Sequence, residues 1–391
     1  MEKYLLSDDT WNNEELEAIN EVIKSNFFTM GERVKKFEKE FAEKFGVKYA
    51  IMSNSGSSAN LLAIAALVYS KKLKAGDEVI VPAVSWSTTF FPLAQYNLKL
   101  KFVDINRETL NIDIAELKKA ITENTKAIFA VNLLGNPNEF NEIIKICKEK
   151  NIILLEDNCE SMGAKYKGKQ LGTIGLIGTY STFYSHHLCT MEGGVTVTND
   201  EELYHYMLSI RAHGWTRNLP ENSKIYKKKE DPFYESFNFI MPGYNLRPLE
   251  MEAAIGSIQL TKLDRIISQR RENATYFKEK ISIFEDIQIQ KEVEESSWFG
   301  FAIILKGKYE GERQQLVEIL RKNNIEVRPI VAGNFTRNKA IEYLNYEIYG
   351  KLENADFIHD NGLFVGNHSI ENKKNIDRLI LAIEEFEKLN G

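Results

Sequence analysis

The window 181–194, S-T-F-Y-S-H-H-L-C-T-M-E-G-G, places His186 and His187 side by side between two runs that look like strands. An imidazole can accept or donate a proton near neutral pH, so the pair is a candidate for acid–base chemistry. Adjacent side chains of an extended segment point to opposite faces and rarely bind one metal ion. The sequence has no H-E-x-x-H or similar ligand spacing. The window therefore predicts a catalytic histidine and no metal site.

Asp157 ends the apolar run I-I-L-L-E-D, which reads as a buried strand. Open α/β sheets bind ligands at the carboxyl ends of their strands, so this carboxylate is a candidate ligand-binding group. A buried carboxylate needs a cationic partner, because an unpaired buried charge is costly. An exposed cap or turn acid is the alternative interpretation of Asp157.

Three further segments combine small, aromatic or polar residues with the start of a helix. Residues 53–60, S-N-S-G-S-S-A-N, suit an anion at a helix N-terminus, or a simple capped turn. Trp86 follows a strand in residues 81–89 and can stack on a planar cofactor or pack in the core. Asn245 and Arg247 precede a helix over 248–262, where they can face a ligand, a partner subunit or solvent.

The elements that must position these residues alternate between strand and helix patterns from residue 48 to about 200. This alternation predicts βα units around a mostly parallel sheet. After about residue 266 a charged helix over 268–280, a strand near 297–306 and a strand over 325–329 predict a smaller α/β domain. We expect an N-terminal arm (1–30), a large domain (31–265) and a smaller C-terminal domain (266–391).

Composition narrows the class of protein. Hydrophobic residues make up 43% of the chain and charged residues 27%, as in ordinary globular enzymes. A net charge of −6 gives no reason to expect nucleic acid or an anionic membrane as a partner. The sequence shows neither a signal peptide nor a long apolar run, so a cytoplasmic location is expected. Three scattered cysteines predict neither a disulfide framework nor a four-cysteine iron–sulfur cluster.

Taken in this order, the segments resemble the fold-type I pyridoxal-phosphate enzymes that modify nucleotide sugars, the keto-sugar aminotransferase and dehydrase family. The resemblance implies an aspartate-aminotransferase-like fold and a homodimer with a shared active site. It implies that Gly56, Ser57 and Ser181 bind the cofactor phosphate, together with Asn245 of the partner subunit. It also implies that Trp86 stacks on the pyridine ring, that Asp157 pairs with the ring nitrogen and that Glu160 contacts the phenolic oxygen. The cofactor-binding positions that it implies are Gly56, Ser57, Trp86, Asp157, Glu160, Ser181 and Asn245.

Aminotransferases of that family read S-F-x-x-x-K-x-I-T-x-G-E-G-G, where the lysine binds the cofactor covalently. This chain has His186 at that position, five residues after Ser181 and six before Glu192. The same S-x-x-x-x-H-H pattern marks a subgroup of sugar 3-dehydratases that use pyridoxamine 5′-phosphate. A related ascarylose-pathway dehydrase also has a four-cysteine iron–sulfur cluster, and no cysteine follows Cys189 here. The resemblance thus implies a cluster-free dehydratase.

The implied reaction removes the C3 hydroxyl of a nucleotide-linked 4-keto-6-deoxy sugar, either GDP-4-keto-6-deoxy-D-mannose or a related GDP-6-deoxy-4-keto heptose. It yields a 4-keto-3,6-dideoxy sugar and ammonia, and L-glutamate regenerates pyridoxamine 5′-phosphate. His186 would be the acid–base group, and His187 would pack or orient. Arg211, His213 and Arg328 are candidates for binding the sugar nucleotide or glutamate, with surface or structural roles as the alternative.

Two other functions remain open from the sequence. One is a sugar aminotransferase that uses another lysine, although Lys165, Lys167 and Lys169 lie in the wrong register. The other is a non-catalytic, cofactor-binding regulator that has lost its lysine.

Overall fold

The computed structural model describes residues 3–390, and its centre is an eight-stranded sheet. From one edge to the other, the strands are β1 (Tyr49–Ser53), β9 (Gly194–Thr198), β8 (Ile177–Ser181), β5 (Ile153–Asp157), β4 (Thr125–Val131), β2 (Glu78–Pro82), β3 (Lys99–Val103) and β12 (Tyr346–Ile348). Neighbours are parallel from β8 to β12, whereas β9 is antiparallel to both β1 and β8. The predicted mostly parallel sheet is confirmed, and β1, β2, β5 and β8 end at the same edge.

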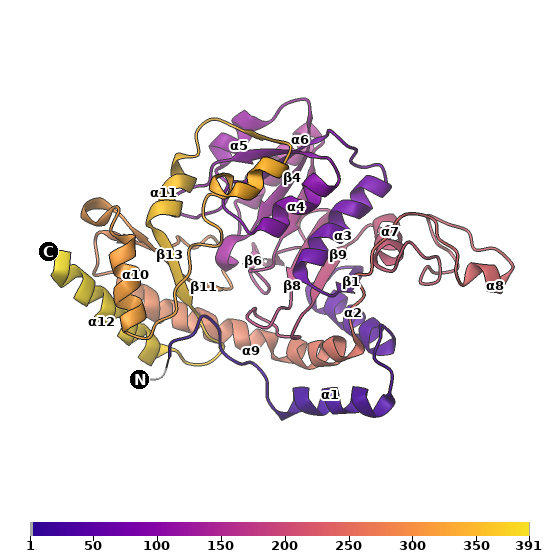
Figure 1. The fold of residues 1–391 in the computed structure, drawn as a ribbon, viewed down its shortest axis with the longest axis horizontal. Helices are drawn as coiled ribbons and strands as arrows, with labels where there is room; N and C mark the ends of the chain where they lie inside the picture. The colour runs from indigo at the N-terminus through magenta and orange to yellow at the C-terminus, as the bar shows by residue number, and fades with distance from the viewer. Residues whose placement is uncertain (1–2, 391) are drawn as a thin grey trace.

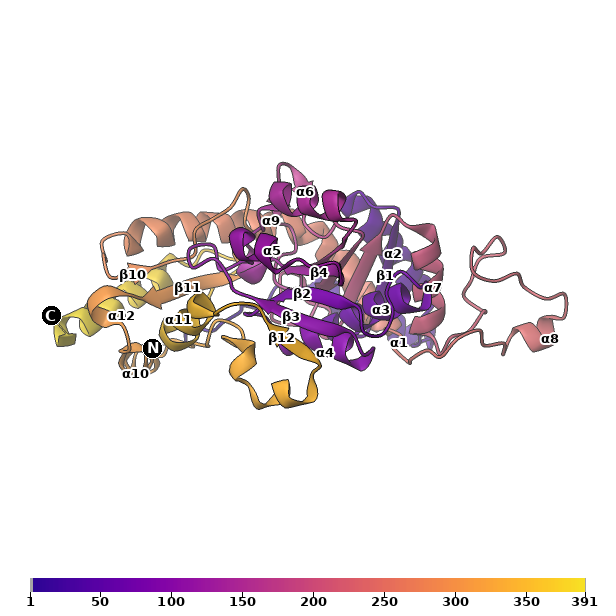
Figure 2. The ribbon, with the colours of Figure 1, turned by 90° about the horizontal axis from the view of Figure 1, so that it is seen from above.

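Helices cover both faces of this sheet, as Figure 2 shows, with α5, α6 and α9 on one side and α3 and α4 on the other. The helices are α1 (Asn13–Ser25), α2 (Glu32–Phe45), α3 (Gly56–Tyr69), α4 (Ser87–Gln95), α5 (Ile114–Ala120), α6 (Phe140–Lys150), α7 (Glu201–Arg211), α8 (Pro232–Glu235), α9 (Glu250–Ile281), α10 (Arg313–Lys322), α11 (Glu353–Asn361) and α12 (Lys373–Asn390). Val79 and Phe129 pack in the core with α3, α4 and α7, whereas Ile80 and Ile128 pack with α5 and α6. This alternation follows from the two-residue period of a strand.

A second, antiparallel sheet lies in the C-terminal part of the chain. It consists of β10 (Ile287–Gln288), β11 (Gly300–Leu305) and β13 (Gly362–Gly366), and its core is shared with α10, α12 and the end of α9. The smaller α/β unit expected after residue 266 is therefore present. A two-stranded hairpin, β6 (Lys165–Tyr166) and β7 (Lys169–Gln170), lies outside both sheets.

Two details differ from the sequence-based expectations. The helices expected over 248–262 and 268–280 are one continuous helix, α9, because no proline or glycine interrupts residues 257–281 and buried positions continue through Leu263 and Ile267. The strand expected over 325–329 is not formed: Ile325 and Arg328 make only isolated bridges, to Tyr4 and Phe364. Helix α9 crosses residue 265, and β12, from the C-terminal part of the chain, joins the large sheet. The domain boundary expected between residues 265 and 266 therefore stays a prediction.

The N-terminal arm runs along the outside of both parts. Figure 1 shows the arm running from near α12, beneath α9, to α1. The arm is tied down where the His368 ring meets Leu5 O at 2.9 Å and where Ser369 N–H donates to Asp8. The segment between α7 and α9 instead carries α8 away from the body (Figures 1 and 2). Every helix within residues 3–390 is too short or too polar to cross a bilayer.

Candidate active site

A cavity of about 320 Å³ lies at the sheet edge where β2, β5 and β8 end. Most of the residues predicted from the sequence line it: Gly56, Ser57, Trp86, Asp157, Glu160, Ser181, His186 and Arg328. They come from segments far apart in the chain, and the parallel strands bring them to one place. These residues therefore line one cavity, and their roles in binding stay a prediction.

The first turn of α3 forms one end of the cavity. Ser55 caps this helix, because its Oγ accepts a hydrogen bond from the Ser58 N–H at 3.0 Å. A Cβ added to Gly56 would lie 2.6 Å from Cβ of Ser181 and 3.1 Å from Sγ of Cys159. Only glycine lets the helix start this close to β8. The N–H groups of the first turn have no partner within the helix, so this end can bind a phosphate.

Asp157 at the end of β5 is only 5% exposed, and both of its oxygens are hydrogen-bonded. Oδ2 accepts from Nδ2 of Asn60 at 2.9 Å and from Oγ1 of Thr89 at 2.8 Å. Oδ1 accepts from the Cys159 N–H at 3.1 Å. These donors fix the carboxylate at the cavity wall, where it can accept a hydrogen bond from a cationic ligand nitrogen.

Glu160 lies on the same loop, three residues beyond Asp157. Burial raises the pKa of its carboxyl to about 7, and the Leu134 N–H that donates to Oε2 at 2.9 Å acts against this rise. A carboxyl group with a pKa near neutrality can keep or share a proton with a ligand oxygen. Glu160 can therefore serve as a hydrogen-bonding partner for a phenolic oxygen.

Trp86 precedes α4, borders the cavity and is 58% exposed. Core packing, the alternative raised by the sequence, would have buried it. A large exposed aromatic surface beside a cavity can cover a planar ligand ring.

His186 lies on a closed loop between β8 and β9. Within it, the Thr182 N–H donates to Gly193 O at 2.9 Å and the Tyr184 N–H donates to Met191 O at 3.0 Å. Burial, together with the nearby charge of Arg270, lowers the pKa of His186 to about 4. Nδ1 of this ring has no hydrogen-bond partner among residues 3–390. The cavity thus holds a neutral imidazole with an unused ring nitrogen.

His187 is fully buried and is not part of the cavity wall. Its Nε2 lies 3.2 Å from Ser297 O, and its ring packs 5.7 Å from the Phe299 ring. Burial holds the pKa of His187 well below its usual value. Packing is one of the two roles predicted for this histidine, and the two residues lie in a bend of the loop instead of a strand.

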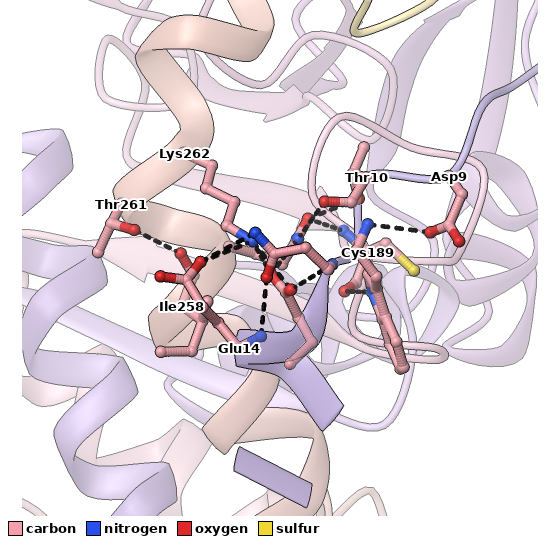
Figure 3. A network of polar contacts seen from close by, with 11 residues as sticks. Asp9, Thr10, Glu14, Cys189, Ile258, Thr261 and Lys262 are labelled. Carbon is pink, nitrogen blue, oxygen red and sulfur yellow. Dashed lines mark hydrogen bonds and ion pairs between the residues drawn. The ribbon is translucent and has the colours of Figure 1, made fainter. Parts of the chain in front are cut away.

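The N-terminal arm holds the other end of the histidine loop (Figure 3). Trp11 Nε1 donates to Cys189 O at 3.0 Å, and the Cys189 N–H donates to Oε1 of Gln259 at 3.2 Å. The same Oε1 accepts from Oγ1 of Thr10 at 2.8 Å, while Nε2 of Gln259 donates to Glu15 at 2.7 Å. The fully buried amide of Gln259 therefore joins the arm, α1, α9 and the histidine loop.

Three predicted residues lie outside the cavity. Arg211 is buried in an ion pair with Glu38 and also donates to Met52 O, so we assign it a structural role. The His213 ring packs 4.9 Å from the Trp215 ring. Asn245 is exposed and accepts from Nε of Arg247 at 2.9 Å.

Sequence reasoning missed several residues at the site. Phe299 and Phe364 close the cavity from the C-terminal part, and Asn60 and Thr89 bind Asp157. Asn60 and Thr89 could have been found, because each lies in the first turns of a helix that follows a candidate loop. Nothing in the local pattern of S-W-F-G marks Phe299 as part of a site.

The chain is similar to known proteins over nearly its whole length. Residues 9–384 match the DegT/DnrJ/EryC1/StrS aminotransferase family. The chain is 59% identical over 389 residues to a GDP-4-keto-6-deoxy-D-mannose 3-dehydratase of Yersinia pseudotuberculosis, with 98% of this chain and 99% of that protein covered.

Two solved structures are also similar to the chain. A GDP-4-keto-6-deoxymannose-3-dehydratase mutant with bound GDP-perosamine is 56% identical and superposes with a TM-score of 0.96, covering 97% of this chain and 100% of that one. A structure of that enzyme with a trapped PLP-glutamate geminal diamine is 56% identical, with a TM-score of 0.95 and coverage of 97% and 99%. These superpositions confirm the predicted aspartate-aminotransferase-like fold.

Proposed function

Because the chain belongs to the DegT/DnrJ/EryC1/StrS aminotransferase family, we propose that it removes the C3 hydroxyl of a GDP-linked 4-keto-6-deoxy sugar. The substrate is GDP-4-keto-6-deoxy-D-mannose, the sugar nucleotide in the name of the Yersinia pseudotuberculosis relative. One L-glutamate is consumed per turnover, and the products are the 4-keto-3,6-dideoxy sugar, 2-oxoglutarate and ammonia. The observation that carries this proposal is His186 in a cavity whose wall contains no lysine among the described residues.

The cavity fits pyridoxal 5′-phosphate and its amine form, pyridoxamine 5′-phosphate. Gly56, Ser57 and Ser181 would hold the phosphate, where a Cβ on Gly56 would fill the space. Asp157 would accept a hydrogen bond from the protonated ring nitrogen, and Trp86 would cover one face of the ring. The bound cofactor supplies an electron sink that no side chain offers.

His186 moves the proton in this proposal. It enters the reaction as a neutral imidazole and takes a proton from carbon C4′ of the bound cofactor. The resulting imidazolium is a ready acid, because burial and Arg270 oppose its charge, so it protonates the departing C3 hydroxyl oxygen. One histidine thus serves both steps, while Glu160 hydrogen-bonds the phenolic oxygen of the cofactor.

The lysine-dependent aminotransferase alternative finds little support in this geometry. Lys165 and Lys169 belong to the β6–β7 hairpin and Lys167 to its turn, and none of them borders the cavity. A histidine cannot form the covalent link that a lysine forms with the cofactor. The site is therefore better suited to dehydration than to transfer of an amino group to the sugar.

Arg328 is the best placed of the predicted substrate-binding residues. It lies in the cavity wall, and its guanidinium makes no hydrogen bond or ion pair with another residue of the 3–390 range. A free guanidinium at a cavity can bind a carboxylate or a phosphate with paired hydrogen bonds. We propose that Arg328 binds glutamate or the sugar nucleotide. We propose no such role for His213, which lies outside the cavity.

A homodimer with shared active sites is part of the proposal. Around α8, Phe233, Tyr234 and Phe237 are 80%, 70% and 65% exposed on a segment that leaves the body of the protomer (Figure 1). Exposed aromatic residues on a projecting segment suit a protein interface. Asn245 lies outside the cavity of its own chain, as a contact to the partner's cofactor requires. Sedimentation of the wild type as a monomer at micromolar concentration would contradict this part.

A cytoplasmic location completes the proposal. Cys147, Cys159 and Cys189 are all free thiols, which suits a reducing compartment. Cell fractionation would test it.

The decisive experiment supplies purified holoenzyme with GDP-4-keto-6-deoxy-D-mannose and L-glutamate. We expect ammonia and 2-oxoglutarate in equal amounts, with a sugar product that is lighter than the substrate by one oxygen atom. An amino sugar without ammonia release would instead support an aminotransferase. No turnover, despite cofactor binding, would favour the regulator. Borohydride treatment should leave no lysine covalently modified by the cofactor.

A further inference from the structure

Arg270 on α9 is a buried cation with no acidic partner in contact. Its side chain is 1% exposed, and burial lowers the pKa of its guanidinium to about 10. The charge of Asp8 partly opposes this lowering of the Arg270 pKa, but within residues 3–390 the two side chains form no ion pair. A buried charge without an acidic partner is costly, so packing alone does not explain an arginine at this position.

The contacts of Arg270 lead to the histidine loop. Its Nη1 donates to Phe299 O at 3.1 Å and to Asn367 O at 2.9 Å. The ring of Phe299 packs 5.1 Å from the ring of His186 and 5.7 Å from that of His187. The arginine therefore fixes the backbone of the residue whose side chain touches both imidazoles.

Segment 297–299 connects these groups. Ser297 offers its carbonyl oxygen to the His187 ring, and Phe299 offers its carbonyl oxygen to Arg270. Nδ1 of each histidine and Nε of Arg270 are buried without a hydrogen-bond partner among the described residues. The N–H groups of Ser297 and Phe299 donate to Gly135 O at 3.0 Å and Leu134 O at 3.1 Å, and Arg270 adds a side-chain contact to the Phe299 carbonyl oxygen.

The charge of Arg270 also reaches both imidazoles. It opposes protonation of His186 and of His187, in the same direction as burial. The other ionisable groups at the cavity wall are the carboxyl groups of Asp157, Glu160 and Glu192, the thiol of Cys159 and the guanidinium of Arg328. Arg271, the next residue of α9, also acts on His187, but its guanidinium is paired with Glu295.

We propose that Arg270 is a positioning residue for the reaction at His186. Through Phe299 it fixes the imidazole in the cavity, and its unpaired charge keeps that imidazole a proton acceptor between turnovers. This inference rests on the proposed role of His186 as the proton carrier. It gives the buried arginine a function that packing alone does not explain.

The test compares Arg270→Met with Arg270→Lys in the holoenzyme, by measuring kcat/KM for dehydration across pH. The methionine variant loses the charge and the lysine variant keeps it, while both lose the guanidinium nitrogen that donates to the carbonyl oxygens of Phe299 and Asn367. We expect the acid limb of the Met profile to move upward by about one pH unit, and the limb of the Lys profile to stay near that of the wild type. Both variants should lose about tenfold in kcat, because the Phe299 carbonyl oxygen loses the guanidinium that orients it.

Arg271→Met is the matched control, since it removes a positive charge one position along the same helix. We expect its acid limb to stay within about 0.3 pH units of the wild type, because this guanidinium is already paired. Equal movement of the acid limb in the Arg270→Met and Arg270→Lys variants, or movement in neither, would overturn the proposal.

A direct measurement separates this inference from the proposed function. The six histidines of the chain can be labelled with ¹⁵N, and the His186 signal can be assigned from its loss in His186→Asn. In wild-type holoenzyme we expect that ring to stay neutral at pH 6.5, and to become protonated at higher pH in Arg270→Met than in the wild type. If Arg270→Met does not fold, the wild type decides: protonation of His186 with an ordinary pKa would refute the proposal. This result does not depend on whether the GDP sugar is turned over.

Discussion

Two walls of the cavity differ in how their polar groups are satisfied. In the sheet wall (Gly56, Asp157 and Ser181), both oxygens of Asp157 are hydrogen-bonded and Oγ of Ser181 accepts from the Phe183 N–H at 3.3 Å. In the histidine wall (His186 and Phe299, with His187, Ser297 and Arg270 packed behind them), four buried polar atoms have no partner among residues 3–390: Nδ1 of His186, Nδ1 of His187, Oγ of Ser297 and Nε of Arg270.

The difference indicates what each wall does. A wall whose groups already have partners is preorganised for binding, because a ligand enters without rearranging it. A wall that keeps a neutral imidazole beside an unpaired cation is costly in the absence of substrate, which is typical of groups that move protons. Binding and reaction are thus assigned to different walls, and substitutions in each should have separable effects.

The largest difference between the effect on dehydration and the effect on cofactor binding is expected for His186→Asn. The substitution removes the proton carrier but none of the sheet-wall contacts. We expect dehydration to fall by about 10²–10⁴-fold, the usual contribution of a general acid–base group. Cofactor affinity, measured by absorbance titration, should change less than about threefold because the phosphate end is unaltered. An equal loss of both would contradict the division between the walls.

Asp157→Asn should affect both binding and reaction. Asparagine is nearly the same size but lacks the charge that pairs with the protonated ring nitrogen. We expect kcat to fall by about 10²–10³-fold, the effect of losing one preorganised electrostatic group. Cofactor affinity should also fall by about tenfold, which the same titration would detect. Unchanged affinity would place the cofactor ring away from Asp157.

Glu160→Gln tests how the stability of the protein depends on pH through the buried carboxyl group three residues after Asp157. Burial raises the folded-state pKa of Glu160 to about 7, above the ordinary carboxyl value of 4.5. Its contribution to stability is therefore fully present below pH 4.5 and is lost as pH rises through 7. The cofactor-free variant should become more stable than the wild type by up to about 3 kcal/mol across that window.

Urea unfolding at pH 4.5, 6 and 8 measures this difference for Glu160→Gln. Glu156 and Glu252 also have pKa values raised to about 7, but they are common to both proteins and cancel. A difference that does not grow with pH would show that Glu160 is not the buried acid described above.

Gln259→Leu is expected to have the smallest effect, through the contact between the arm and the histidine loop (Figure 3). The leucine keeps the volume but leaves the Cys189 N–H and the Thr10 hydroxyl without their acceptor. We expect the free energy of unfolding to fall by about 1–3 kcal/mol. Thr261→Ala, on the exposed face of the same helix, should change it by less than about 0.5 kcal/mol. Equal effects of the two substitutions would mean that Gln259 adds nothing specific.

Much of the sheet wall could be predicted from the sequence. Asp157 ends an apolar run, Gly56 lies between a strand and a helix, and Ser181 follows an expected strand. These patterns are local, because strand and helix periodicities place each residue at a known point of its own βα unit. The parallel sheet then brings the ends of those units together.

The histidine wall could be predicted only in part. Sequence patterns indicated His186, but Phe299 lies more than a hundred residues away in a segment with no distinctive pattern. Arg270 resembled any charged residue on an amphipathic helix, and Arg211 resembled a substrate-binding arginine until its ion pair with Glu38 was located. A charged residue becomes structural or functional according to its partners, which local spacing does not specify.

The sequence by itself determined the order of the βα units and the edge of the sheet at which the predicted site residues gather, and its resemblance to a family predicted that His186 takes the place of a lysine. The tertiary structure alone decided which arginine is buried behind that histidine, which is paired and which is free at the cavity. The reason is physical: periodicity is fixed by backbone geometry over a few residues, whereas burial and charge pairing depend on side chains that meet only when the whole chain is folded.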